Sequence, residues 1–484
     1  MGASEAIAFL NFSGLAPTPK GGGVREVLEP ATGRLLSTVG IANAADMAVA
    51  TRAAAAAQKA WVAVPPREKA EVFRRAGALF QQHFDELALY ATRETGGILP
   101  KGQHEIREAI TICHLAAAMP LQSQGHVLPS VPGRTSIARR VPHGVVGVIS
   151  PFNFPLILTI RAVAPALAAG NAVVIKPDSR TPVTGGLMIA RVFAEAGLPK
   201  DLLQVLPGDA EAGEALVTDP LVPMIAFTGS PAVGRRIGEL AGKHLKKVSL
   251  ELGGANSLLI LDDADLDVAA SNAAWGAYLH QGQICMASNR ILVQRSIVAE
   301  LTQRLVGKAT HLPVGDGASG QVALGPLIDT KQRDRVHAIV QDSIQAGATL
   351  EAGGTYDGLF YKPTVLSGVK PGMRVFDEET FGPVANIITF DTDEEAIALA
   401  NNNTGSLACA VISKSVGRAM AVGQQLKCGM VHINDQTVND DCVNPFGGPG
   451  IAGNGSSVGG PADWEEYTQW QWMTVKDTAP MYPF

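Results

Sequence analysis

A single cysteine, Cys285, lies where two patterns of different periodicity meet. Residues 269–279 before it are rich in alanine, with large apolar side chains at helical spacing, and residues 290–293 after it have the composition of a strand. Gly282 loosens the backbone between them, so the thiol could stand at the bottom of a cleft. Taken alone, Cys285 does not predict a nucleophile, because free cysteines are among the most buried and inert residues.

Two other polar residues lie in apolar surroundings. Glu251 falls within the strand-like run 248–252, where burial is expected to raise its pKa toward the value that a general base needs near neutral pH. The alternative is a glutamate on the wet face of an edge strand. Asn153 lies between Phe152 and Phe154, where it is either a turn residue or an amide donor for an oxyanion.

Two further features mark places where a nucleotide could bind. Lys176 ends the apolar run 171–176, and the carboxyl ends of strands bind nucleotides in doubly wound sheets, but a lysine at a strand end is more often a solvated charge unless a second signal places a ligand there. Residues 227–234 follow a strand and open a helix, with Ser230 suited to the N-cap and Pro231 to the first turn. The N–H groups of such a helix end can hold a phosphate, but an ordinary capped helix has the same pattern.

Alternating strands and helices would bring these residues together. Strands are expected at 145–149, 171–176, 202–206, 224–227 and 247–252, and helices at 156–169, 183–196, 210–218 and 231–243. This alternation predicts an α/β fold with a mostly parallel, covered sheet. Around it we expect a hairpin in residues 1–40, helices at 43–61, 66–95 and 103–118, a β arm at 127–141, a second α/β segment from 255 to about 432, and a strand at 467–475.

The bulk composition excludes several classes of protein. A chain of 484 residues is expected to form two or more domains, and 46% hydrophobic with 17% charged residues is an ordinary globular composition. A net charge of −6 without a basic block argues against binding to nucleic acid or a membrane surface. The N-terminus lacks a basic n-region, and the five cysteines form no metal or disulfide pattern. We therefore expect a cytoplasmic protein without a metal site.

Seven stretches, in this order along the chain, give it a resemblance to the NAD(P)-dependent aldehyde dehydrogenase superfamily. They are SPFNFP (150–155), PALAAGN (165–171), FTGSPAVG (227–234), LELGG (250–254), GQIC (282–285), ETFGP (379–383) and PFGG (445–448). The segments 431–436 and 482–484 look most like those of the bacterial aromatic-aldehyde members, the benzaldehyde and vanillin dehydrogenases.

The resemblance implies a catalytic role for each of three residues. Cys285 would attack the aldehyde carbon as a thiolate, and the Asn153 amide with the Cys285 backbone N–H would stabilise the oxyanion. Hydride would pass to the nicotinamide and leave a thioester, which a water activated by Glu251 would hydrolyse to the carboxylic acid. Glu251 argues against a CoA-acylating member, and the presence of all three residues argues against a non-catalytic scaffold. A semialdehyde or aliphatic aldehyde dehydrogenase remains the alternative to an aromatic one.

The resemblance also implies binding residues. Lys176 would contact the adenosine ribose, Ser230 the pyrophosphate and Glu379 the nicotinamide ribose, and Phe381 would pack near the nicotinamide. The whole expected cofactor set is Ser150, Phe152, Lys176, Ser179, Arg180, Gly229, Ser230, Glu379 and Phe381. The expected substrate set is Phe154, Arg161, Ile284, Met286, Gln436 and Asn439.

Three departures from the family pattern bear on specificity. Ser179 replaces a glutamate that is common in NAD-preferring members. A neutral residue there, with Arg180 beside it, would not repel the 2′-phosphate of NADP, so the sequence allows either NAD or NADP as the cofactor. Arg161 stands where many members have an aromatic residue, and it either binds a polar ring substituent or forms a structural ion pair. The polar loop 436–441 favours substituted aromatic aldehydes over long alkyl ones.

The fold implied by the resemblance has three parts. A Rossmann-type cofactor domain would comprise residues 1–124 and 143–253, and a catalytic domain residues 254–442. Residues 125–142 and 443–484 would form an oligomerisation arm and a C-terminal strand. A strand that completes a neighbour's sheet hides its own edge, so we expect a homodimer or a homotetramer.

Overall fold

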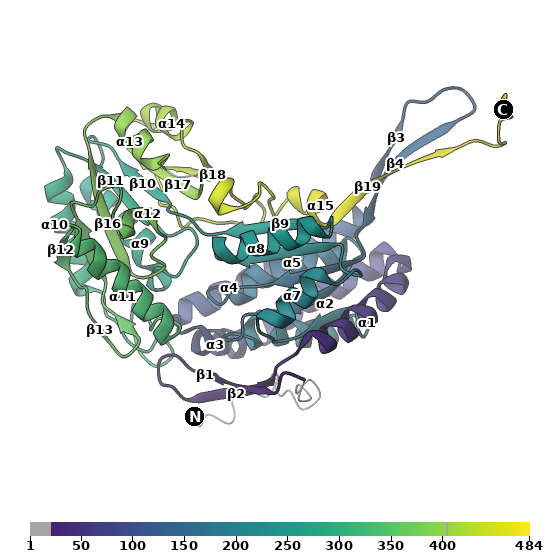
Figure 1. The fold of residues 1–484 in the computed structure, drawn as a ribbon, viewed down its shortest axis with the longest axis horizontal. Helices are drawn as coiled ribbons and strands as arrows, with labels where there is room; N and C mark the ends of the chain where they lie inside the picture. Colours follow the sequence, from purple (N-terminus) through teal and green to yellow (C-terminus); the bar gives the residue numbers. More distant parts are fainter. Residues whose placement is uncertain (1–20, 403–404) are drawn as a thin grey trace.

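The fold is taken from a computed structural model, which describes residues 21–402 and 405–484. The part of the predicted N-terminal hairpin that falls in residues 1–20 lies outside the described residues. Within them, β1 (Val24–Leu28) and β2 (Leu35–Gly40) form the expected antiparallel hairpin around a turn at 29–34. It lies below the first α/β body, near the described start of the chain (Figure 1).

The first α/β body is built on a parallel five-stranded sheet with the order β7-β6-β5-β8-β9. Its strands are β5 (Val145–Ile149), β6 (Ala172–Lys176), β7 (Leu203–Val205), β8 (Met224–Gly229) and β9 (Lys247–Leu252). Every residue of β5 is buried, as expected for a strand that is covered on both faces. The covering helices are α5 (Pro155–Ala168), α6 (Met188–Glu195), α7 (Ala210–Thr218) and α8 (Pro231–Lys243).

The N-terminal helices form a further layer against this body (Figure 1). They are α1 (Ala44–Ala63), α2 (Pro66–Gln82), α3 (Phe84–Thr95) and α4 (Leu99–Ala118), and α4 packs against α2, α3 and α5. The single helix expected over 66–95 is two helices, because His83 (φ −104°, ψ 23°) interrupts it. The helix expected at 183–196 begins as a π-helical turn, Val183–Leu187, before α6.

The second α/β body is built on a seven-stranded sheet with the order β12-β15-β16-β11-β10-β17-β18, parallel except for β12. Its strands are β10 (Ser257–Ile260), β11 (Arg290–Gln294), β12 (Thr349–Ala352), β15 (Thr364–Ser367), β16 (Val384–Phe390), β17 (Ser406–Ile412) and β18 (Cys428–Ile433). Its helices are α9 (Leu266–Tyr278), α10 (Val298–His311), α11 (Thr330–Gln345), α12 (Arg374–Asp377), α13 (Asp393–Ala400) and α14 (Val416–Gly423). A two-stranded hairpin, β13 (Tyr356–Asp357) with β14 (Phe360–Tyr361), accompanies them.

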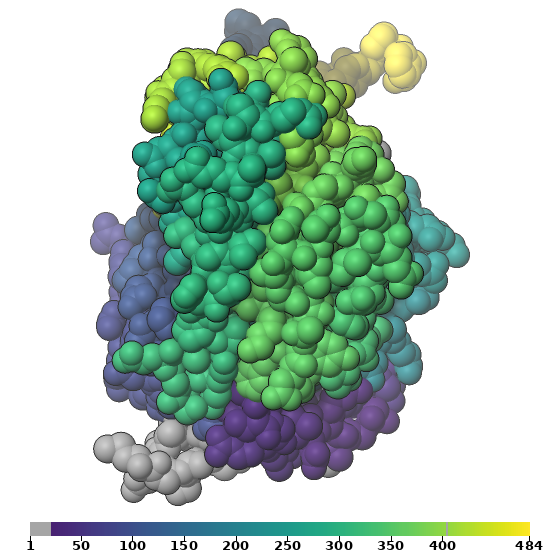
Figure 2. All heavy atoms as spheres, turned by 90° about the vertical axis from the view of Figure 1, so that its left-hand side faces the viewer, coloured from purple at the N-terminus to yellow at the C-terminus, as the bar shows by residue number. Residues whose placement is uncertain are grey.

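Seen from its own side, the second body presents one broad face, and the N-terminal part of the described chain lies along the lower edge of this face (Figure 2). The two bodies also share packing. Ile284 and Met286, which flank Cys285, belong to the hydrophobic core of the first body, as does Phe446. The loop that carries Cys285 is therefore fixed by both bodies, and the candidate site lies where they meet.

A narrow three-stranded sheet projects from the first body (Figure 1). It has the order β19-β4-β3 and comprises β3 (Gly125–Leu128), β4 (Thr135–Pro142) and β19 (Thr468–Val475), with β19 and β4 paired from Thr468↔Pro142 to Val475↔Thr135. Residues 443–461 do not join it. They return over β9, where Gly453 bridges to Glu251, and lead through α15 (Ala462–Tyr467) into β19. Among the described residues, no helix is both long and apolar enough to span a bilayer.

Candidate active site

The segment before Cys285 has a left-handed backbone over three consecutive residues. His280, Gln281 and Gly282 have φ values of 46°, 56° and 67°, an unfavourable conformation for the two that are not glycine. The Gln281 side chain fixes it by donating hydrogen bonds to the backbone carbonyls of Gly96 (2.9 Å) and Pro326 (2.8 Å). The sequence predicts flexibility at Gly282 alone, whereas the structure has a loop held rigidly from both sides.

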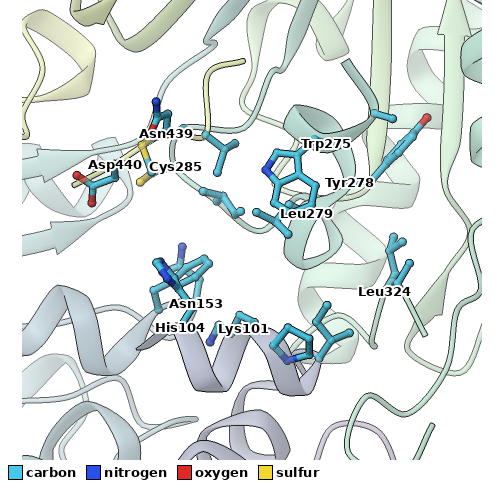
Figure 3. Close-up of a pocket in the computed structure, with 18 of the residues that line it drawn as sticks. Lys101, His104, Asn153, Trp275, Tyr278, Leu279, Cys285, Leu324, Asn439 and Asp440 are labelled. Atoms are coloured by element: carbon cyan, nitrogen blue, oxygen red, sulfur yellow. The ribbon is translucent and has the colours of Figure 1, made fainter. Parts of the chain in front are cut away.

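Cys285 lies at one end of a pocket of about 850 Å3 between α4 and α9 (Figure 3). We call it the large pocket. Asn153 approaches Cys285 from the α4 side, and Trp275, Tyr278 and Leu279 form the opposite wall, as their helical spacing predicts. Five residues of the expected catalytic and substrate sets line the pocket beside Cys285: Asn153, Phe154, Ile284, Met286 and Asn439.

Asn153 is buried and its amide points toward the Cys285 loop. Its Nδ2 donates to the backbone carbonyl of Gln283 at 2.9 Å, two residues before the sulfur-bearing residue. The Cys285 carbonyl in turn accepts a hydrogen bond from Asn256 Nδ2 at 2.7 Å. Two side-chain amides from different bodies therefore fix the backbone around Cys285, and one of them also faces the large pocket.

The surroundings of Cys285 favour the neutral thiol. Burial raises the pKa of Cys285 well above its ordinary value, and the nearby carboxylates of Glu379, Asp440 and Glu251 raise it further. A cysteine in this environment reacts slowly until its proton is removed, since the thiolate is the nucleophilic form.

Glu251 occupies a second, smaller cavity of about 20 Å3, which we call the Glu251 cavity. Burial raises the pKa of its carboxyl well above the ordinary value, as expected from the sequence, and the positive charge of Arg161 opposes this rise. Neither carboxylate oxygen has a hydrogen-bond partner among the described residues. Its walls are mostly apolar, but the side chains of Glu251, Arg161 and Ser249 also line it, and a space of this size with such polar groups suits one water molecule. Phe446 and Leu158 line both cavities and therefore separate them.

Arg161 lies in the Glu251 cavity and not in the wall of the large pocket, where the substrate set places it. Its Nη1 pairs with Asp440 Oδ2 at 2.5 Å, and its Nη2 donates to the carbonyls of Asp441 and Asn444. Of the two alternatives for Arg161, the structure shows the ion pair. Gln436 is also not among the residues that line the large pocket, and its side chain bonds the carbonyl and the N–H of Val438, which stabilises the loop.

The expected nicotinamide end of the cofactor site is a buried carboxylate, Glu379. Burial raises the pKa of Glu379 to about 8, and its Oε1 has no hydrogen-bond partner among the described residues. It lies directly over Gly253, where a Cβ would come within 2.3 Å of the carboxylate. Phe381 is beside it and meets Phe152 edge to face, with ring centroids 5.8 Å apart.

The expected adenosine and phosphate end lies at the carboxyl edge of the first sheet. Lys176 ends β6, opposite Gly213, and Ser150 follows β5 with its hydroxyl buried and unpartnered among the described residues. Ser230 caps α8 directly after Gly229, and its Oγ accepts from the Val233 N–H at 3.5 Å. A carboxylate with one oxygen unpartnered within the described chain at one end and a helix N-terminus at the other fit a dinucleotide.

Arg180 is not available as expected for a 2′-phosphate. Its guanidinium forms a bidentate pair with Asp178 (2.9 and 2.8 Å) and reaches Asp329 of the second body at 2.9 Å. It also lies over the ring of Phe152, 4.0 Å from the centroid. Ser179 is partly exposed between these charged residues. Sequence reasoning missed Asp178 and Asp329, because only the fold brings Asp329 to this edge.

The comparisons with known proteins agree with this geometry. Residues 18–473 match the model of the aldehyde dehydrogenase family. A vanillin dehydrogenase of Amycolatopsis sp. is 52% identical over 96% of both chains, and a benzaldehyde dehydrogenase [NAD(+)] of Pseudomonas putida is 49% identical over 96% of this chain and 95% of its own. The crystal structure of betaine aldehyde dehydrogenase from Staphylococcus aureus in complex with NAD+ superposes with a TM-score of 0.93 at 31% identity, covering 96% of this chain and 94% of that one.

The family match spans nearly the whole chain, and the site contains a cysteine, an amide and a buried glutamate at the junction of two α/β bodies. Both findings confirm the resemblance and the fold class predicted from the seven sequence stretches. The chain belongs to the aldehyde dehydrogenase family.

Proposed function

We propose that this enzyme oxidises aromatic aldehydes to carboxylic acids with NAD(P)+, through a covalent intermediate on Cys285. The large pocket carries the proposal, because Cys285 and Asn153 share one end of it while apolar side chains line most of the rest. Ligand pockets of enzymes combine apolar walls with a few placed polar groups in this way. The vanillin and benzaldehyde dehydrogenases among the relatives support an aromatic substrate.

In the first half of the reaction, the Cys285 thiolate adds to the aldehyde carbon and forms a thiohemiacetal. The Asn153 Nδ2 and the Cys285 backbone N–H stabilise the oxyanion, once Asn153 releases the Gln283 carbonyl that it now bonds. The chemistry that NAD(P)+ supplies when bound is acceptance of a hydride from the substrate carbon. Cys285 then holds the acyl group as a thioester.

In the second half, Glu251 activates the water that hydrolyses the thioester. A buried carboxylate with a raised pKa is a suitable proton acceptor near neutral pH. The Glu251 cavity has room for that water, and a rotation of Glu251 past Phe446 would bring its carboxylate toward Cys285. Arg161 keeps part of the Glu251 population ionised through its positive charge. In this proposal Arg161 therefore acts on the base and not on the substrate.

The cofactor would extend from β6 to Glu379. Lys176 and Ser150 would bind at the adenosine ribose, Gly229 and Ser230 at the pyrophosphate, and Glu379, Phe381 and Phe152 around the nicotinamide ribose. We propose NAD+ as the preferred cofactor. Arg180 is neutralised by Asp178 and Asp329, so a 2′-phosphate would meet the Asp178 carboxylate without a free arginine to offset it.

We further propose that residues 125–142 and 468–475 form the interface of a homodimer or homotetramer, and that the enzyme acts in the cytoplasm. A three-stranded ribbon without its own core is marginal in water and gains stability from a partner. The cysteines of the described chain are all free thiols, which suits a reducing compartment.

Initial rates on a panel of aldehydes, with NAD+ and NADP+ compared, test these proposals. We expect the highest kcat/KM for benzaldehyde, vanillin and hydroxybenzaldehydes with NAD+, and a free acid as product in the presence of CoA. Higher values for hexanal or decanal would contradict the aromatic assignment. A thioester product formed with CoA would contradict the hydrolytic step.

A further inference from the structure

A buried ion pair lies on α4, and its lysine, Lys101, lines the large pocket together with Asn153 (Figure 3). Lys101 Nζ donates to Glu105 Oε1 at 2.5 Å, one turn away on α4, and the two side chains are 2% and 0% exposed. Removing two charges from water costs several kcal/mol each, so such a pair is a poor source of stability alone. The proposed reaction uses neither residue, so the pair calls for another explanation.

The second oxygen of Glu105 holds the helix that follows Asn153. Glu105 Oε2 accepts hydrogen bonds from the backbone N–H groups of Leu156 (2.9 Å) and Ile157 (3.3 Å), in the first turn of α5. The N-cap residue of α5, Phe154, supplies no side-chain acceptor of its own. Glu105 therefore supplies the missing cap, and its negative charge is favourable at the positive end of the helix.

Lys101 holds the residue directly after Asn153. Its ammonium lies 4.7 Å from the centroid of the Phe154 ring, while His280 of the Cys285 loop meets the same ring edge to face at 5.2 Å. Lys101 also donates to Thr95 Oγ1 at 3.2 Å, which fixes its ammonium from α3. The backbone on the carboxyl side of Asn153 is thus clamped twice, at Phe154 and at the start of α5.

We propose that the Lys101–Glu105 pair is the positioning unit of the Asn153 amide. It sets where Asn153 Nδ2 points relative to the Cys285 sulfur, and so whether the amide meets the oxyanion. Only a carboxylate offers one oxygen to the lysine and one to the helix N–H groups, because a glutamine has a single acceptor. The inference rests on the proposed function, in which Asn153 stabilises that oxyanion.

The chain contains a matched control. Glu94 of α3 is also a fully buried carboxylate, and it accepts from the backbone N–H groups of Val183 (3.0 Å) and Thr184 (2.7 Å) at the start of another helix. That helix follows β6 and carries no candidate catalytic residue. Glu94→Gln therefore changes the same kind of cap at a residue that hydrogen-bonds Val183 and Thr184 and not α5, and whose charge acts on Lys101 and Glu105 only through space.

The test is a double-mutant cycle with Glu105→Gln and Asn153→Ala, with kcat and KM for benzaldehyde as readouts. We expect Glu105→Gln to lower kcat about tenfold or more with little change in KM, since a small misplacement of a catalytic group is costly. In the Asn153→Ala background, Glu105→Gln should change kcat less than twofold, because residues that act as one unit are not additive. Glu94→Gln should leave kcat within twofold.

A second readout separates positioning from general damage. The rate of Cys285 alkylation by iodoacetamide should stay within twofold in Glu105→Gln, because the pair holds Asn153 and not the thiol. If the effects of Glu105→Gln and Asn153→Ala multiply, or if Glu94→Gln lowers kcat as much, the inference is wrong. Should Glu105→Gln fail to fold, the same cycle is run with Lys101→Met/Glu105→Gln, which leaves no unpaired buried charge, and additivity there overturns the inference equally.

Different results would contradict the proposed function and the positioning role of the ion pair. A wild-type enzyme that oxidises no aldehyde contradicts the proposed function. A wild-type enzyme that is active, but whose cycle is additive, contradicts only the positioning role of Lys101 and Glu105.

Discussion

At the residue scale, burial has opposite consequences for the two groups proposed as nucleophile and base. It raises the pKa of both Cys285 and Glu251. A raised pKa makes Glu251 a better proton acceptor near neutral pH, but it makes Cys285 less nucleophilic, because fewer molecules carry the thiolate. Nearby charges then adjust each group, Asp440 and Glu379 at the thiol and Arg161 at the carboxylate. The two ion-paired residues Arg161 and Asp440 thus influence both steps of the proposed reaction.

Asp440→Asn is expected to make Cys285 more reactive. Removing this negative charge lowers the pKa of Cys285, so a larger fraction is thiolate at any pH below that pKa. The alkylation rate with iodoacetamide should rise severalfold at neutral pH. Asp441→Asn is the control, because its exposed carboxylate accepts, within the described part of the chain, a hydrogen bond from the Val443 N–H alone. Equal rates in both variants would contradict the assigned charge effect.

Arg161→Met is expected to move the acid limb of the pH profile of kcat to higher pH. Loss of the positive charge raises the pKa of Glu251 further, so less of it is ionised at a given pH and less can act as a base. Arg161→Lys keeps the charge and should move the limb less. The measurement is the pH profile of kcat with benzaldehyde. A limb that stays in place while KM rises would instead return Arg161 to the substrate set.

The sequence could indicate single candidate residues better than the partners that they contact. Cys285, Asn153 and Glu251 belong to short stretches whose order along the chain is diagnostic, and the structure brings each to one junction. The role of Arg161 could not be decided, because its partner Asp440 is 279 residues away in the chain. The same holds for Arg180, whose contact with Asp329 depends on how the two bodies meet.

At the element scale, strand ends and helix starts position the site. Asn153, Lys176 and Ser230 each follow or end a strand of the first sheet, so parallel strands bring them to one edge. These elements were predictable because buried parallel strands are continuous apolar runs. The break at His83 was not, since the apolar pattern of 66–95 continues across it. The left-handed backbone at His280 and Gln281 was not predictable either, because neither histidine nor glutamine by itself indicates that conformation.

Gly282→Ala is expected to abolish activity and lower the melting temperature. An added Cβ would lie 2.1 Å from the Gly382 carbonyl oxygen, at a φ of 67° that alanine disfavours, so the cost should exceed about 1 kcal/mol. Gly307→Ala is the control, because a Cβ there meets nothing within 4 Å inside α10. It should stabilise the protein by up to about 1 kcal/mol. The measurements are the melting temperature and kcat of both variants. A fully active Gly282→Ala enzyme would contradict the conclusion that the Cys285 loop is rigid.

Asp178→Asn is expected to shift cofactor preference toward NADP+. The change removes a negative charge beside Lys176 and frees one of the two guanidinium N–H groups of Arg180 that now bond Asp178. A 2′-phosphate would then meet less repulsion and a better donor. The ratio of kcat/KM for NADP+ to that for NAD+ should rise severalfold over wild type. Asp334→Asn, an exposed carboxylate on α11, is the control. An unchanged ratio would place the 2′-hydroxyl away from Asp178.

At the scale of the whole molecule, a few contacts join the two bodies around the cofactor edge. Arg180 reaches from the first body to Asp329 at the N-cap of α11 in the second, and Phe152 of the first body meets Phe381 of the second. The Cys285 loop is bonded to Gly96 of the first body through Gln281. The relative position of the bodies therefore determines the geometry of the site, and any contact that fixes the bodies also fixes the catalytic groups.

The projecting sheet presents large apolar side chains to solvent on a ribbon with no core of its own. Val127 of β3 is 78% exposed and Trp472 of β19 is 67% exposed, on strands that both pair with β4. Exposed apolar area of this kind marks an interface, and the outer edge of β19 can pair with another strand. We therefore expect Val127→Glu/Trp472→Glu to be monomeric by size-exclusion chromatography with light scattering, while the wild type is a dimer or tetramer. Val49→Glu, at a 60% exposed valine on α1, is the control and should keep the wild-type mass. If the double variant also keeps that mass, the subunits associate through another surface.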